Sequence, residues 1–192
     1  MQTREMALLI QDAVLLPAGR LEIRVALPAE LAMVVMVLKG QCGLAFGAQK
    51  SNDTLPCYAT VTECDIIDFN QLEDNTLSIV LEGRQRLKVL SAAMRSDGIW
   101  IARTLPCQNW RDEPIVGEFE IISAALEQFY EVNPDLLELY TQVHLEDATW
   151  VSQRWLEVLP MYNRDKLLLV EQPDCHKTMD FVLQLLRSHV DV

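Results

Sequence analysis

The chain is 192 residues long, half of them apolar and 23% charged, which is typical of a globular protein with one domain or two small lobes. Its net charge is −12, and this charge argues against nucleic acid as the main partner, because phosphate binding requires a basic surface. No apolar run approaches the roughly 20 residues of a membrane-spanning helix, and the amino terminus is a poor signal peptide, so we expect a cytoplasmic protein.

Residues 1–110 carry the alternating apolar pattern of β-strands, interrupted by one helix. Pro28-Ala29-Glu30 is typical of a helix start, and Lys39-Gly40 of a helix end. Between them, one helical face carries Leu31, Val34, Val35 and Leu38. Strands are predicted at residues 21–25, 44–46, 57–69, 77–81, 86–94 and 99–105, the last two joined by a turn at Asp97-Gly98. We therefore predict an antiparallel β lobe of six or seven strands with one helix.

The stretch from Thr76 to Val89 contains a glycine inside a strand pattern, in the sequence Glu82-Gly83-Arg84-Gln85-Arg86. A glycine at such a position indicates a β-bulge or the close approach of another backbone. We interpret Glu82, Gly83 and Arg86 as a structural motif. A ligand site is the alternative, although no catalytic group is visible there.

From Pro114 the apolar period changes to that of helices. The first predicted helix has an apolar face at Ile115, Phe119, Ile122, Leu126 and Phe129, and Asn133-Pro134 begins a second, which extends to His144. Asp147 caps a third helix that Pro160 ends, and two more follow. Residues 112–192 hold 16 acidic and 5 basic side chains. We therefore predict an acidic α-helical lobe at residues 111–192.

Three stretches, in this order along the chain, resemble the amino-terminal substrate-binding domain of Lon proteases. They are the strand–turn–strand–helix sequence at 15–38, the Glu-Gly-x-x-Arg strand ending at Arg86, and Leu159-Pro160 with the helices at 166–171 and 181–186. The sequence departs from many relatives at Ala26–Glu30, where they carry Phe-Glu-Pro-Arg-Tyr. The resemblance spans residues 8–190 and implies an α+β fold, in which a PUA-like antiparallel β pseudo-barrel precedes an α-helical bundle.

The resemblance also implies a standalone, non-catalytic bacterial recognition domain, because the ATPase and serine–lysine protease modules of a complete Lon protease are not in this sequence. We expect it to bind unfolded or flexible polypeptide, or a specific protein partner, as an adaptor, a regulator of proteolysis or a weak chaperone. The alternative is a small-molecule or RNA-binding module that uses the PUA-like lobe. Tryptophan is a favoured anchor at interfaces, so the candidate partner-binding residues are Trp100, Trp110 and Trp155.

An unrecognised hydrolase is a third hypothesis, and little in the sequence favours it. The carboxylates of Glu63, Asp65 and Asp68 do not converge on a strand, and no nucleophile motif is present. The histidines are scattered at His144, His176 and His189, and the five cysteines contain no Cys-x-x-Cys. We expect no metal, no cofactor and reduced core thiols. Trp150 and Trp155 lie five residues apart on one predicted helix, so we expect one of them to be exposed or to lie at an interface between the lobes.

Overall fold

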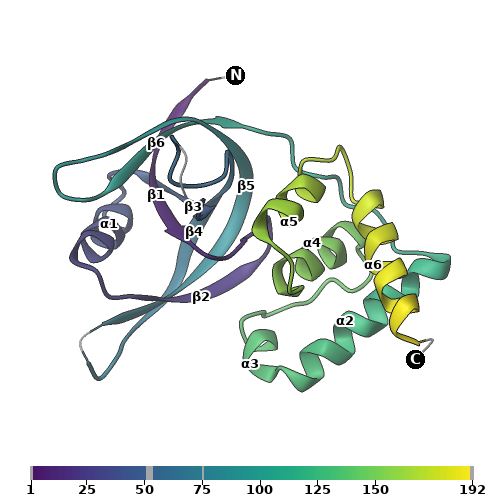
Figure 1. Ribbon diagram of the computed structural model, residues 1–192. Helices are drawn as coiled ribbons and strands as arrows, with labels where there is room; N and C mark the ends of the chain where they lie inside the picture. Colours follow the sequence, from purple (N-terminus) through teal and green to yellow (C-terminus); the bar gives the residue numbers. More distant parts are fainter. Residues whose placement is uncertain (1, 51–53, 75, 191–192) are drawn as a thin grey trace. The chain divides into compact units, whose positions relative to one another are not determined.

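A computed structural model describes residues 2–50, 54–74 and 76–190, the side chains of the last two excepted, and the chain forms two compact units (Figure 1). We call Met1–Asn109 the β unit and Trp110–Val192 the helical unit. The β unit contains β1 (Arg4–Gln11), β2 (Arg20–Val25), α1 (Pro28–Leu38), β3 (Gly43–Ala48), β4 (Thr60–Gln71), β5 (Leu77–Met94) and β6 (Trp100–Pro106).

The six strands of the β unit form one sheet that closes on itself. The strand order is β2-β5-β4-β3-β1-β6, and an additional pairing of β5 with β6 completes a barrel of β5, β4, β3, β1 and β6. The mixed α+β fold is as predicted, but β1 and β3 are parallel, with Met6 opposite Gly43, whereas the sequence predicted an antiparallel lobe. Parallel neighbours need a crossover connection, and here β2 and α1 provide it.

The long strand β5 changes partners along its length. Residues 77–82 pair with β2, and residues 87–94 pair with β6, while β4 runs beside most of the strand. Two predicted strands, at 77–81 and 86–94, are therefore one continuous strand of 18 residues. Because β5 belongs both to the barrel and to the pairing with β2, it holds the two parts of the sheet together.

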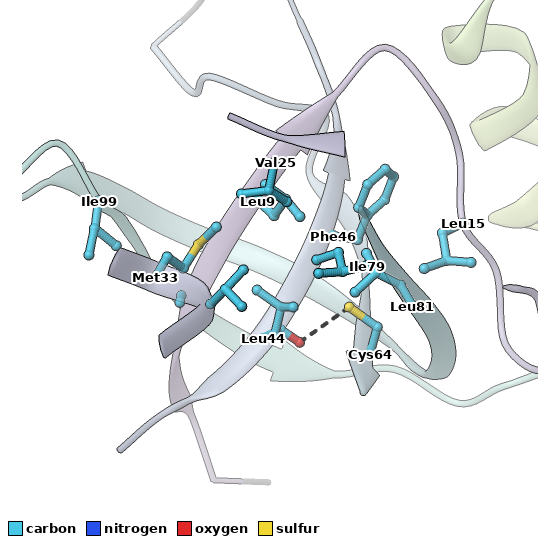
Figure 2. Packing of buried hydrophobic residues seen from close by; sticks show 12 residues of the cluster. Leu9, Leu15, Val25, Met33, Leu44, Phe46, Cys64, Ile79, Leu81 and Ile99 are labelled. Atoms are coloured by element: carbon cyan, nitrogen blue, oxygen red, sulfur yellow. Dashed lines mark hydrogen bonds between the residues drawn. The ribbon is translucent and has the colours of Figure 1, made fainter. Parts of the chain in front are cut away.

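Two clusters of buried apolar side chains lie on the two faces of β1. Ala7 and Leu9 belong to one cluster, while Met6 and Leu8 belong to the other, as the alternation of a strand requires. The first cluster includes Met33 of α1, so the helix covers this face (Figure 2). Burial on both faces explains why β1 reads as a continuous apolar run rather than an alternating one.

The helical unit contains a short 3₁₀ helix, η1 (Gly117–Phe119), and the α-helices α2 (Glu120–Val132), α3 (Pro134–Leu137), α4 (Ala148–Val158), α5 (Asn163–Val170) and α6 (His176–Val190). The Asp147 carboxylate caps α4 by accepting a hydrogen bond of 2.9 Å from the Thr149 backbone N–H. Every residue from Ala148 to Leu156 is buried, so α4 is the central helix of the unit. Trp150 and Trp155 are both buried, so neither is exposed, which was one of the two environments expected for one of them.

Two helix boundaries in this unit also differ from the prediction. The first helix begins at Glu120 rather than near Ile115, because Pro114 forms a β-bridge with Asp147 and the preceding segment is extended. The second helix ends at Leu137, so His144 lies in an irregular segment rather than on a helical face.

Candidate functional site

Helix α1 is apolar on nearly every side, and Glu30 is its only charged residue. Of the four residues on the predicted apolar face, only Val34 is buried. Val35 and Leu38 are 47% and 49% exposed. The other buried residue of α1 is Met33, which the predicted apolar face did not include. Three exposed apolar residues lie along one side of the helix, and we call them the α1 stripe, which consists of Leu27, Val35 and Leu38. Leu31 lies between them but packs against the buried core cluster.

The α1 stripe begins beside a pocket in the β unit. Leu27, at the amino-terminal cap of α1, is 61% exposed and lines this pocket. The pocket has a volume of about 320 Å³, and we call it the β-unit pocket. It lies between β1, the first turns of α1 and the β5–β6 hairpin, and its lining is mostly apolar, from Leu8, Leu9, Ile10, Leu27, Ala29, Met33, Pro56, Gly98, Ile99 and Trp100, with Glu30 and Gln49 as polar groups.

Glu30 is held in the pocket wall by the start of α1. Its carboxylate accepts a hydrogen bond from the Leu27 backbone N–H at 3.4 Å, which is one half of a capping box, and another from Gln11 Nε2 at 3.4 Å. Both distances are long for a hydrogen bond. Within the part of the chain that the structure describes, no basic side chain forms an ion pair with Glu30. The pocket thus combines apolar walls with one carboxylate whose contacts are neutral groups.

The three candidate tryptophans have different environments. Trp100 is half-buried on β6 and lines the β-unit pocket. Trp110 and Trp155 are buried in the helical unit, where their indole N–H groups donate to the backbone oxygens of Gln172 at 2.7 Å and Ile122 at 2.9 Å. A partner-binding role for any of the three stays a prediction, and Trp100 has the side chain that lines a concave surface.

The Glu82-Gly83-x-x-Arg86 motif fixes the path of the backbone. The Glu82 carboxylate accepts a hydrogen bond from Arg20 Nε at 2.8 Å, across the β2–β5 pair. Arg86 is buried, its side chain donates to the backbone oxygen of Gln108, and its backbone N–H donates to Asn109 Oδ1 at 2.9 Å. The motif therefore ties β5 both to β2 and to the segment that ends the β unit.

Gly83 itself lies where another part of the backbone crosses β5. A Cβ atom at this position would lie 2.1 Å from the Leu16 carbonyl oxygen. Two hydrogen bonds of 2.9 Å secure the crossing, from Ala18 N to Gly83 O and from Gly83 N to Gly19 O. The register of β4 against β5 also shifts here, because Arg84 is an extra residue on β5. Gly83 thus lies both at a β-bulge and at the close approach of another backbone, the two features that a glycine inside a strand pattern indicates.

The three carboxylates weighed as a hydrolase cluster, which all lie among the described residues, do not converge. Glu63 pairs with Arg4 at 3.0 Å, and Asp65 pairs with Arg84 at 2.8 Å. His144 lies 3.4 Å from Glu146. The side chain of His189 lies outside the described residues.

Burial raises the pKa of Cys57 to about 11 and that of Cys175 to about 12, and it also raises the pKa of Cys64. His176 and Cys175 both contact the Glu113 carboxylate, at 3.1 and 3.0 Å. Among the described residues, no group of three histidine, cysteine, aspartate or glutamate side chains could hold a metal ion. Neither does any described helix have the length and apolar content to cross a membrane.

The fold is that of a Lon amino-terminal domain. It matches the crystal structure of a Lon N-terminal domain protein from Xanthomonas campestris with a TM-score of 0.73 and 24% identity, over 94% of this chain and 97% of that one. It also matches the N-terminal domain of the Mycobacterium avium complex Lon protease, with a TM-score of 0.64 and 13% identity, over 94% of this chain and 96% of the other.

The chain belongs to the family of the ATP-dependent protease La (LON) substrate-binding domain, whose model matches residues 6–188. The family match covers both the β unit and the helical unit. A substrate-binding domain of this family is a non-catalytic recognition domain. A search of curated proteins found no match to the chain.

Proposed function

We propose that this domain recognises flexible, apolar segments of polypeptide through the β-unit pocket and the α1 stripe. The observation that carries the proposal is an apolar helix face left exposed directly beside an apolar pocket. Exposed apolar patches of this kind mark interaction surfaces. A folded protein buries most of its apolar side chains, whereas an unfolded segment can offer them to both surfaces. Membership of a substrate-binding family supports the same role.

In the cell, such a domain acts as an adaptor, a regulator of proteolysis or a weak chaperone. A bacterial, cytoplasmic setting agrees with the two bacterial Lon structures that the chain resembles and with five cysteines that are free thiols. The PUA-like description of the barrel rests on the family resemblance.

A small-molecule site is the second candidate function, and the pocket itself favours it. Its volume of about 320 Å³ lies at the lower end of the roughly 300–1,000 Å³ of ligand pockets, and its mostly apolar lining with two polar groups is typical of them. RNA fits less well, because the chain carries a net charge of −12. A compound released from the denatured protein and identified by mass spectrometry would support this candidate.

Fluorescence anisotropy with a labelled, permanently unfolded polypeptide tests the main proposal. Folded protein and RNA serve as control ligands. A double variant, Leu27→Ser with Val35→Ser, removes apolar surface from the α1 stripe without disturbing the core. Fully burying one such side chain contributes about 1.5–3 kcal/mol, so we expect binding to weaken about tenfold or more.

The matched control is Val132→Ser with Leu168→Ser, because both residues are exposed apolar side chains of the helical unit. We expect this variant to bind as the wild type does. Equal losses in the two double variants would show that the α1 stripe is not the binding surface. A complete lack of binding at high micromolar protein would rule out general polypeptide recognition.

A further inference from the structure

Glu30 gives the β-unit pocket a charge preference. We infer that the recognised segment presents an apolar side chain to the pocket and a neighbouring lysine or arginine to the Glu30 carboxylate. This inference rests on the proposed function, and it names the class of segment that the same site selects. It commits to an apolar–basic polypeptide segment as the occupant of the pocket.

The contacts of Glu30 leave it able to bind a cation. An ionised carboxylate has about four acceptor positions, and the two hydrogen bonds that Glu30 accepts are both 3.4 Å long and come from neutral donors. The walls around it are apolar, from Leu9, Met33, Ile99 and Trp100 among others. A charge pair that is partly removed from water in such surroundings is stronger than the same pair in bulk solvent.

The position of Glu30 also disfavours an acidic segment. The amino-terminal end of a helix carries a partial positive charge that attracts anions. Glu30 lies in the first turn of α1, so its own carboxylate offsets this charge and repels a second carboxylate. A segment with a neutral residue at this position would fill the apolar part of the pocket and leave Glu30 without a charged partner.

Three labelled, unstructured peptides of equal length test the inference by fluorescence anisotropy. They share the same apolar residues and differ at one neighbouring position, which is lysine, serine or glutamate. The variant Glu30→Gln removes the charge, and it keeps the helix start intact because the glutamine side-chain oxygen can also accept the hydrogen bond from the Leu27 backbone N–H. Glu127→Gln is the matched control, since it changes the net charge equally at an exposed position of α2.

We expect the wild type to bind the lysine peptide about twofold to fivefold more tightly than the serine peptide, which is the range of a partly exposed ion pair. The glutamate peptide should bind most weakly, and higher salt should reduce the differences. In Glu30→Gln the three peptides should bind with similar affinity, whereas Glu127→Gln should keep the wild-type order.

Two results would overturn the inference. One is equal binding of the lysine and serine peptides to the wild type, a comparison that needs no variant to fold. The other is an unchanged preference for lysine in Glu30→Gln. In both cases the peptides still bind, so polypeptide recognition stands and only the role of Glu30 is refuted. If none of the peptides binds the wild type, the proposed function itself fails.

Discussion

Replacing Gly83 with alanine tests the backbone crossing on which the β unit depends. The added Cβ would lie 2.1 Å from the Leu16 carbonyl oxygen and 2.8 Å from its carbonyl carbon, and both atoms belong to the backbone. No side-chain rotation can relieve such an overlap, so the segment around Leu16 must move away from β5. Overpacking of this kind costs about 1–3 kcal/mol.

The displacement also weakens the two hydrogen bonds that Gly83 exchanges with Ala18 and Gly19. A typical hydrogen bond contributes about 0.5–1.5 kcal/mol, so we expect Gly83→Ala to lower the free energy of unfolding by about 2–6 kcal/mol in total. Urea unfolding, followed by circular dichroism and by tryptophan fluorescence, measures this change.

Gly43→Ala is the matched control for this experiment. Gly43 also lies in a strand, but its added Cβ would meet the flexible end of the Met6 side chain, 2.6 Å away, which can rotate aside. We expect it to cost much less, because alanine also restricts the unfolded chain. Equal stability of Gly83→Ala and the wild type, or equal losses in the two variants, would refute the argument from the crossing.

Three further predictions concern buried polar and titratable groups. Glu157→Ala should cost about 3–5 kcal/mol, because it removes the carboxylate that neutralises Arg154, whose side chain is fully buried. Glu118→Ala breaks an ion pair of the same 2.6 Å length with Arg187, but both side chains are more than half exposed, so it should cost less than about 1 kcal/mol in the same urea titration. Alkylation of the native protein at pH 8, read by mass spectrometry, should spare the buried thiols and label the half-buried ones, Cys42 and Cys107. Burial raises the pKa of Cys175 from 9.0 in the unfolded chain to about 12. The contribution of this thiol to the free energy of unfolding is therefore complete below pH 9 and is lost as the pH rises towards 12; urea titrations whose unfolding free energy stays constant above pH 9 would contradict this.

The sequence predicted those features that one residue type determines locally. Only glycine fits where the backbone at Leu16 crosses β5, so the glycine at position 83 was enough to predict that another backbone segment lies close to it. Asp97-Gly98 identified the hairpin turn, and Gly98 has a φ of 84°. Asp147 identified the start of α4 by its capping carboxylate. In each case a short-range constraint decided the structure.

Features that depend on residues distant in sequence were harder to predict from the sequence. Helix α1 is apolar almost all round, so periodicity could not separate Val34, which is buried, from Val35, which is exposed. Helix α4 is enclosed on every side, and Trp150 and Trp155 are both buried although they lie on different faces. The β-unit pocket combines β1, α1 and the β5–β6 hairpin, which are distant in sequence, so no local pattern contains it.

The closure of the barrel has a consequence for biosynthesis. Strand β1 pairs with β6, and the Thr104 hydroxyl donates a hydrogen bond of 3.1 Å to the Arg4 backbone oxygen, 100 residues earlier. At about 5–20 residues per second, a ribosome needs roughly 5–20 seconds to make the intervening chain. Throughout that interval one edge of the first strand has no partner, and an unpaired apolar edge invites pairing with other chains. This domain is therefore most prone to aggregate while it is being synthesised, before its last strand reaches its first.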